Sequence, residues 1–155
     1  MVDILNPVER SALMARVRRE NTKPEMVVRR LVHSFGYRYR LHRRNLPGKP
    51  DLAFISRRKV IFVHGCFWHG HAGCSLATIP KTRRAFWCAK FEANRTRDRR
   101  VRVDLKRAGW ASLVVWECET RHPEGISDKL VAFLEAPNRT GQGALASSMG
   151  SKRRS

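Results

Sequence analysis

Three cysteines and one histidine have a spacing that suits a metal ion. Cys66, His71 and Cys74 fall within nine residues, and Cys118 follows 44 residues after Cys74. Tetrahedral Zn²⁺ takes four sulfur and nitrogen ligands of this kind. Because the segment around them holds glycines and has no apolar period, a metal would supply the order that packing cannot. We expect a structural zinc site; the alternative is that the cysteines are small buried residues and His71 lies at the surface.

A second group of residues has the chemistry of phosphodiester cleavage. Asp51 opens the apolar run DLAFI, His64 ends the run KVIFVH, His69 follows in a loop, and Glu25 precedes them. Divalent Mg²⁺ takes hard oxygen ligands, and a base must remove a proton from the attacking water. Two simpler interpretations stay open: an Asp at this place is often a turn residue, and Glu25 completes a capping box that begins at Thr22.

Aromatic residues stand between the expected metal ligands. Phe67 and Trp68 are adjacent in a loop of a basic protein, and a metal-anchored loop would present both rings for stacking on bases or wedging between them. Core burial explains one of the two equally well. Trp87 fits core packing or DNA contact, whereas Met14 is more typical of a core residue.

The charge of the chain indicates a polyanionic partner. Its 155 residues carry a formal net charge of +19. Residues 1–50 hold 12 basic and 4 acidic side chains, and residues 81–107 hold 11 and 3. The runs RYRLHRR and RDRRVR, the latter with Arg97, Arg99 and Arg100, suit phosphate, so nucleic acid is the expected partner. The alternative is a solvated basic face. No long apolar stretch or signal peptide is evident, which predicts a soluble, unexported protein without a membrane partner.

The elements expected to position these residues alternate between helix and strand, so we predict an α/β fold with a mixed central sheet flanked by helices. Capping signals at Asn6-Pro7 and at Thr22-Lys23-Pro24-Glu25 predict two helices, and Gly36 ends the second. Cys88, in the middle of the long basic helix, is expected to be a packing residue. The further elements are strands at 37–42, 51–55, 59–64 and 111–117, a loop at 65–80, and helices at 82–107 and 127–135. Residues 1–136 are predicted to form one domain and residues 137–155 a flexible basic tail.

The segments NTKPE, LPGKPDLAF, VIFVHGCFWHGH, PKTRRAFW, RDRR and LVVWEC together resemble the very-short-patch repair endonucleases, which are bacterial DNA mismatch nicking enzymes. The resemblance runs from about Glu9 to Cys118. It implies a restriction-endonuclease-like fold with structural zinc and catalytic Mg²⁺. It also implies incision of duplex DNA 5′ to the thymine of a T:G mismatch, in a methylated cytosine context where 5-methylcytosine has deaminated.

The resemblance also assigns roles to single residues. Asp51 becomes the Mg²⁺ ligand with the backbone carbonyl of Val63, a position where a Thr can occur in the family. His69 becomes the activator of water, His64 assists at the phosphate, and Glu25 holds metal-bound water. Zinc falls to Cys66, His71, Cys74 and Cys118, and the wedging residues are Met14, Phe67, Trp68 and Trp87. The implied setting is a monomer in the bacterial cytoplasm, associated with the nucleoid during repair, with mismatch-repair proteins as candidate partners.

Two other classes of protein would share part of this pattern. A noncatalytic, zinc-stabilised DNA-binding module needs only the basic runs and the metal ligands, and Asp51 would then be a turn residue. An RNA-binding protein of the translation machinery is favoured by the isoelectric point of about 11.4 and the small size alone.

Overall fold

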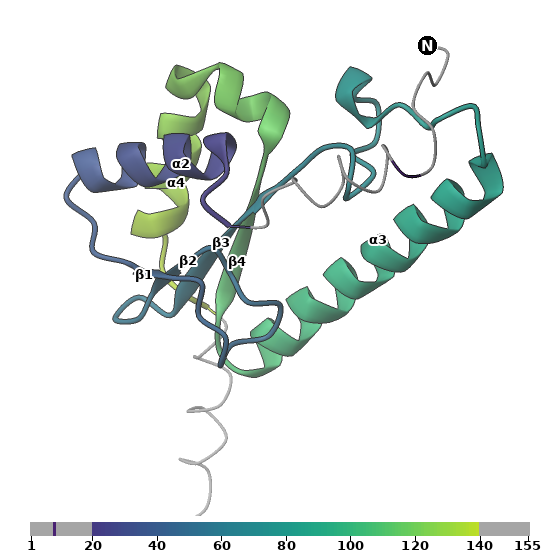
Figure 1. Cartoon of the computed structure of the whole chain (residues 1–155). Helices are drawn as coiled ribbons and strands as arrows, with labels where there is room; N and C mark the ends of the chain where they lie inside the picture. The colour runs from purple at the N-terminus through teal and green to yellow at the C-terminus, as the bar shows by residue number, and fades with distance from the viewer. Residues whose placement is uncertain (1–7, 9–19, 140–155) are drawn as a thin grey trace, which may run out of the picture.

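The computed structural model describes residue 8 and residues 20–139. Its centre is a mixed sheet of four strands in the spatial order β1-β2-β3-β4 (Figure 1). β2 is antiparallel to both β1 and β3, and β4 runs parallel to β3, in register from Lys59 opposite Ala111 to His64 opposite Trp116. The strands are β1 (Arg40–Leu41), β2 (Leu52–Phe54), β3 (Lys59–His64) and β4 (Ala111–Trp116).

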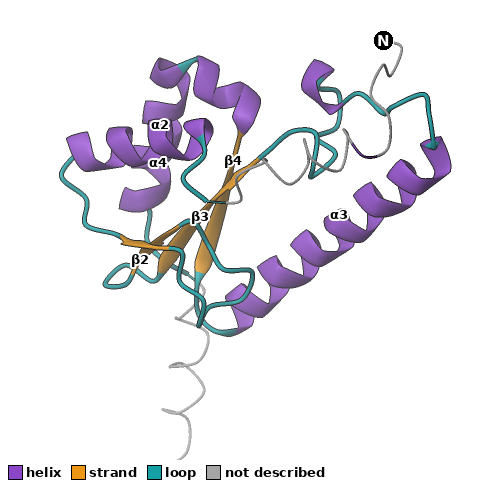
Figure 2. Cartoon of the chain, in the orientation of Figure 1, coloured by secondary structure: helices purple, strands orange, loops and turns teal. Residues whose placement is uncertain are grey.

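Helices cover both faces of this sheet, which gives three layers (Figure 2). Helices α2 (Lys23–Ser34) and α4 (Pro123–Glu135) lie on one face, and the 24-residue helix α3 (Arg84–Arg107) lies on the other. Short 3-10 turns occupy Ser75–Ala77 and Glu117–Arg121. In the described part of the chain, no helix combines the length and the apolar character needed to cross a membrane.

The two faces of the sheet have separate cores, because successive strand residues point to opposite sides. Toward α2 and α4 the buried residues are Val28, Val32, Leu52, Phe54, Ile61, Val115, Ile126, Leu130 and Leu134. Toward α3 they are Ala53, Val60, Phe62 and Leu105. The second core is smaller, and α3 diverges from the sheet toward its N-terminal end (Figure 1).

The predicted α/β class, with a mixed sheet and flanking helices, is confirmed. The strand expected at 37–42 is reduced to Arg40–Leu41, and the last helix begins at Pro123 rather than at residue 127. Pro at the first turn of a helix is a start signal that explains the earlier beginning. The prediction that Cys88 packs in the core is wrong, since its side chain is exposed. Of the helix expected after Asn6, the structure describes only residue 8. Met14 lies outside the described residues.

Candidate active site and metal centre

Strand alternation directs the predicted catalytic residues toward α3. Asp51 is two residues before Ala53, and His64 is two residues after Phe62, so both share the side of the sheet that faces α3. A cleft of about 570 Å³ lies there. The predicted residues Asp51, His64 and His69 all line it, together with the carbonyl-bearing Val63 and with Asp98 of α3.

The Asp51 carboxylate is fixed by the neighbouring strand. Its Oδ2 accepts a hydrogen bond of 2.7 Å from the backbone N–H of Val63. Burial raises the pKa of Asp51 from 3.8 to about 6 and the charge of Glu25 adds to the rise, while the Val63 hydrogen bond and the charges of His42 and His69 oppose it. Two carboxylates held this close form a site where a cation would be stabilising.

Glu25 caps its helix and also faces Asp51. Its side chain is buried; Oε2 accepts a hydrogen bond from the backbone N–H of Asn21 at 2.8 Å, and Oε1 lies 2.6 Å from His42 Nε2. Ligand atoms of Glu25, His42 and Asp51 lie within 4.8 Å of one another. Glu25 therefore completes the capping box and also lies near Asp51, so its role in the site stays a prediction. The donor set of two carboxylates and one imidazole suits a divalent cation.

His69 is held by an acidic residue of α3. Its Nδ1 lies 2.7 Å from Asp98 Oδ2, which leaves Nε2 as the nitrogen that can act on a bound substrate. Burial would raise the pKa of Asp98, but the His69 hydrogen bond and the charges of His69, His64 and Arg102 outweigh burial and lower it. The pair has the geometry of a base and the carboxylate that orients it.

His64 is buried beneath His69. The two imidazoles stack with ring centroids 3.8 Å apart and planes 4° from parallel. Burial, followed by the charge of His69, lowers the pKa of His64 from 6.5 to about 4, with a smaller contribution from Arg102 and an opposing one from Asp98. His64 is therefore neutral at neutral pH.

The four predicted metal ligands come together in the structure. One ligand atom each from Cys66, His71, Cys74 and Cys118 lies within 4.8 Å of the other three, and Cys118 Sγ is 3.5 Å from His71 Nδ1. Burial raises the pKa of Cys66 to about 12, whereas the backbone N–H of Leu76 lowers that of Cys74. Three sulfurs and one nitrogen at such separations fit a tetrahedral cation, which would hold the thiols as thiolates.

One tryptophan joins the metal centre to the cleft. Trp116 stacks on His71 with ring centroids 4.1 Å apart and meets His64 edge-on at 5.4 Å. Because Trp116 ends β4 beside the end of β3, the sheet fixes both contacts. A shift of the loop that holds His71 would therefore be transmitted through Trp116 to His64.

The aromatic residues predicted to meet DNA form a single cluster at the N-terminal end of α3. Phe67 contacts Trp68 and Trp87 with ring centroids 5.1 and 5.4 Å apart. Trp87 is only 6% exposed, whereas Phe86 beside it is 46% exposed. Lys90 Nζ lies 5.3 Å from the ring centroid of Trp68. Trp87 thus packs within this aromatic cluster, as the core interpretation expects, and its contact with DNA stays a prediction.

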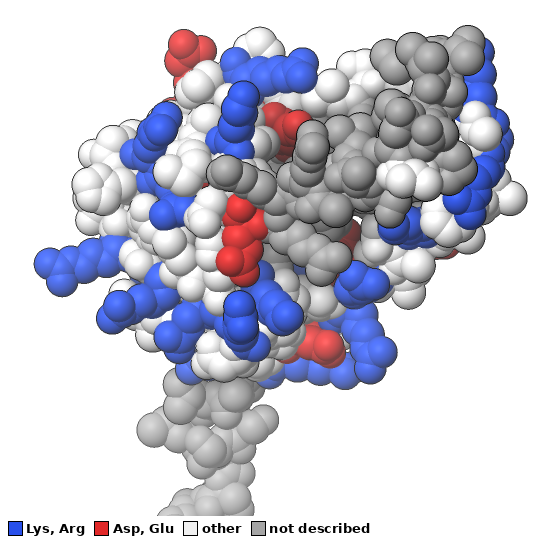
Figure 3. Space-filling model, viewed as in Figure 1, with Lys and Arg blue, Asp and Glu red and all other residues white. Residues whose placement is uncertain are grey.

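Helix α3 anchors the loop that carries these rings. Asn94 donates to the carbonyl of Trp68 at 2.7 Å, and Arg95 donates to the carbonyl of Gly70 at 2.6 Å. The predicted phosphate-binding residues Arg97, Arg99 and Arg100 are exposed on the same helix. Lys and Arg side chains gather along the lower edge of the molecule and around α3, and acidic side chains form only small separate groups on this face (Figure 3).

Sequence reasoning missed three residues of the site. Asp98 could have been found as the one acid within the basic run RTRDRR, three residues after Arg95 on the same helix face. His42 carries no such signal, because only the folded chain brings it to Glu25. Arg95 could not be distinguished from the other arginines of α3 by sequence.

Comparison with known proteins shows the family of this chain. The family model of the DNA mismatch endonuclease Vsr matches residues 2–75. The type II nicking enzyme V.XorIIP of Xanthomonas oryzae pv. oryzae is 56% identical over 135 residues, which cover 87% of this chain and 98% of the relative. The DNA mismatch endonuclease Vsr of Escherichia coli is 37% identical over 146 residues, 94% of this chain and 93% of the relative. The chain therefore belongs to the Vsr family of DNA mismatch endonucleases.

Proposed function

We propose that this protein is a Mg²⁺-dependent endonuclease that nicks duplex DNA 5′ to the thymine of a T:G mismatch and so starts repair of deaminated 5-methylcytosine. The observation that carries the proposal is the cleft between the sheet and a basic helix, where Asp51, His64, His69 and Asp98 meet in a chain of the Vsr family. The three-layer arrangement supports the expected restriction-endonuclease-like fold.

His69 is the base of the proposed reaction. Asp98 binds Nδ1 at 2.7 Å, which selects the tautomer with a free Nε2 and stabilises the imidazolium that forms when His69 takes a proton from water. The proton thus moves from the attacking water to His69 Nε2. The neutral, buried His64 stacks on the His69 ring and so fixes the orientation of that ring. His64 also assists at the phosphate as a neutral hydrogen-bonding group.

Asp51 and the backbone carbonyl of Val63 would hold Mg²⁺, with Glu25 next to them. When bound, this ion polarises the scissile phosphate and offsets its negative charge. The raised pKa of Asp51, about 6, supports the assignment, since a carboxylate that is costly to ionise alone gains most from a cation. Ionised Asp51 is also the hydrogen-bond acceptor for the Val63 N–H, which orients it toward the cleft.

The metal centre and the aromatic cluster serve substrate recognition. Zinc on Cys66, His71, Cys74 and Cys118 would fix the loop that presents Phe67 and Trp68, and these two rings with Trp87 and Met14 would wedge beside the mispair. Unstacking costs a few kcal/mol per base step and is least at a mismatch, which favours a T:G site. Arg97, Arg99 and Arg100 would hold the phosphate backbone.

The test is a nicking assay on end-labelled duplexes that differ only in T:G or T:A, with and without Mg²⁺. We expect wild type to make a single nick in the T:G duplex, 5′ to the mispaired thymine. This nick should be absent without Mg²⁺, and the variants Asp51→Ala and His69→Ala should not make it. Asp128→Ala and His33→Ala remove the same side chains from exposed sites and should cut at the wild-type rate. Binding of the mismatch without any product would favour a noncatalytic DNA-binding module.

Zinc has its own test. Metal analysis should find one zinc per chain, and Co²⁺ replacement should give the visible spectrum of a tetrahedral site with thiolate ligands. A protein that folds and nicks without stoichiometric zinc would contradict this assignment.

A further inference from the structure

Three charged residues of α3 share the helix face that borders the cleft. Arg95, Asp98 and Arg102 follow one another at spacings of three and four residues, which places them on one side of a helix. All three line the cleft. Arg95 donates to the Gly70 carbonyl and Asp98 binds His69. These two side chains therefore position the loop that carries His69.

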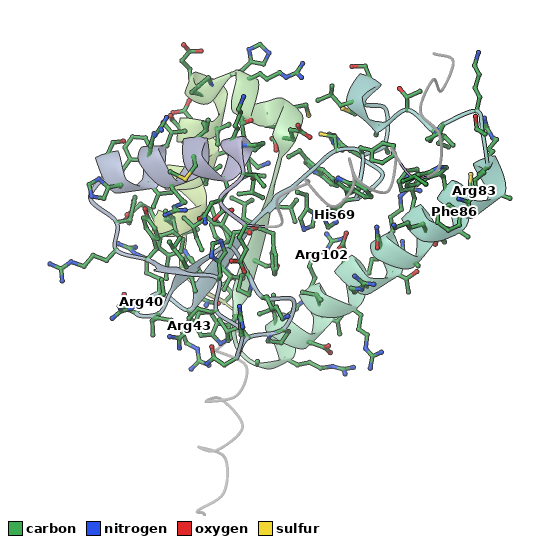
Figure 4. All side chains as sticks on the ribbon, in the orientation of Figure 1. Arg40, Arg43, His69, Arg83, Phe86 and Arg102 are labelled. Atoms are coloured by element: carbon green, nitrogen blue, oxygen red, sulfur yellow. The ribbon has the colours of Figure 1, made fainter. Side chains whose placement is uncertain are left out.

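Arg102 differs from them because it has no partner among the described residues. No carboxylate of the described residues lies within ion-pair distance of its guanidinium, although Asp98 is four residues away on the same helix face. Figure 4 shows Arg102 close to His69, in the space between the sheet and α3. A guanidinium in this place offers a planar fork of donors to whatever occupies the cleft.

Arg102 lies beside the residue that holds the proposed base. It follows Asp98 by four residues on the same face of α3, and Asp98 Oδ2 lies 2.7 Å from His69 Nδ1. The cleft is also lined by Lys49, Arg97 and Arg99. Arg99 is moreover paired with Glu92 at 3.3 Å. Among the α3 cations that line the cleft, Arg102 is therefore the one that shares a helix face with Asp98 and has no partner among the described residues.

The proposed reaction needs a permanent cation there. His69 must begin neutral if it is to accept a proton. Asp51, Glu25 and Asp98 are carboxylates. A phosphodiester gains negative charge on its oxygens as water attacks. Besides the metal, the residues given a role so far would offer that charge a hydrogen bond from His64 and no permanently positive side chain.

We propose that Arg102 is a catalytic residue that binds a non-bridging oxygen of the scissile phosphate and stabilises the charge that develops there. The inference rests on the proposed function. The water oxygen bonds to phosphorus, its proton passes to His69, and the bond from phosphorus to the leaving deoxyribose oxygen breaks as that oxygen takes a proton from solvent. Arg102 keeps its own proton throughout and acts by hydrogen bonding and charge.

Single-turnover nicking of the T:G duplex by Arg102→Ala and Arg102→Lys tests the role. Loss of one preorganised donor to a developing oxyanion costs about 100-fold or more in rate. We expect a loss of that size for Arg102→Ala, a partial recovery for Arg102→Lys, and a duplex Kd that changes by no more than about threefold. Arg107→Ala, which removes the same charge from an exposed position one helical turn or more further along α3, should nick and bind like wild type.

Chemical rescue separates a contact at the phosphate from a general effect of charge. Because Arg102 is exposed to the cleft, small guanidinium ions can enter the space left in Arg102→Ala. Guanidinium at tens of millimolar should restore part of the nicking rate of Arg102→Ala, while NaCl at equal ionic strength should not. Neither salt should speed wild type or Arg107→Ala. Zinc content and thermal unfolding, measured for every variant, check that each is folded.

Three results would overturn the inference. The first is an Arg102→Ala rate within a few-fold of wild type, and the second is a rate loss fully accounted for by weaker DNA binding at subsaturating protein. The third is rescue by NaCl as well as by guanidinium. Absence of any nick by wild type would instead overturn the proposed function, so the two failures are distinguishable.

Discussion

At the scale of the residue, Asp51 shows how function can cost stability. Its pKa rises from 3.8 to about 6 chiefly because burial disfavours the charged form. Between those two pH values the folded chain binds a proton that the unfolded chain has released, so the free energy of unfolding falls as pH rises through this window. Above it, ionised Asp51 destabilises the Mg²⁺-free protein by about 3 kcal/mol, which a bound cation would offset.

Asp51→Asn should therefore stabilise the zinc-loaded, Mg²⁺-free protein at pH 7, by about 2–3 kcal/mol relative to wild type. The amide is neutral and its oxygen can still accept from Val63 N–H. The gain should shrink as pH falls from 6 toward 4, because wild-type Asp51 then becomes protonated in the folded state. Urea unfolding at several pH values measures this, and a gain that is independent of pH would contradict the assigned cause.

In the proposed reaction, Asp98 acts through His69. Asp98→Asn leaves the shape of the side chain but removes the charge that stabilises the His69 imidazolium, so we expect kcat for nicking to fall by about 100-fold or more with little change in DNA affinity. Asp104→Asn, on the same helix and outside the cleft, is the matched control. Equal losses in the two variants would mean that Asp98 matters only for the charge of the helix.

At the scale of the element, the loop before β2 must lie very close to α3 to bring Asp51 to the cleft. Gly48 has φ +73, and a Cβ there would lie 2.4 Å from Val101 Cγ1 and 3.2 Å from a Phe62 ring carbon. Only glycine combines that backbone conformation with so close an approach.

Gly48→Ala should lower the free energy of unfolding by about 1–3 kcal/mol through strain and overpacking. Gly36→Ala is the control, since Gly36 also has positive φ but no atom within 4 Å of the added Cβ, so it suffers backbone strain alone. In a Val101→Ala background the cost of Gly48→Ala should fall toward that of Gly36→Ala. An unchanged cost in the double-mutant cycle would show that the Val101 contact is relieved by movement elsewhere.

The elements also show what sequence can and cannot predict. Helix α2 begins where its Thr22 cap and Pro24 place it, and β3 follows the apolar run KVIFVH, because these signals are local. The cluster of Cys66, His71, Cys74 and Cys118 could be predicted because three of its members are close in sequence and are of residue types that bind metal ions. His42 and Asp98 were missed because their roles come from contacts across 17 and 29 residues, which no local pattern contains.

At the scale of the whole molecule, charge and shape contribute differently to DNA binding. Phosphate contacts release counterions, so affinity should fall steeply with salt, with a log–log slope near −0.9 for each phosphate neutralised. Wedging by the aromatic cluster is uncharged and should respond weakly to salt. The described contacts also extend past residue 136, since the Asn138 side chain donates to the carbonyl of Arg58 at 2.9 Å.

Truncation after Arg139 separates the two contributions. The removed residues 140–155 hold Lys152, Arg153 and Arg154 and no acidic side chain, while Asn138 stays in place. We expect the salt slope for T:G and T:A duplexes alike to become shallower by no more than about 3. The ratio of the two affinities at each salt concentration and the single-turnover nicking rate should stay as in the full chain, because the cleft and the aromatic cluster lie within residues 20–139. Fluorescence anisotropy over a series of salt concentrations measures the slope and the ratio together. A truncated protein that binds T:G and T:A equally would place mismatch selection in the C-terminal segment and not in the aromatic cluster.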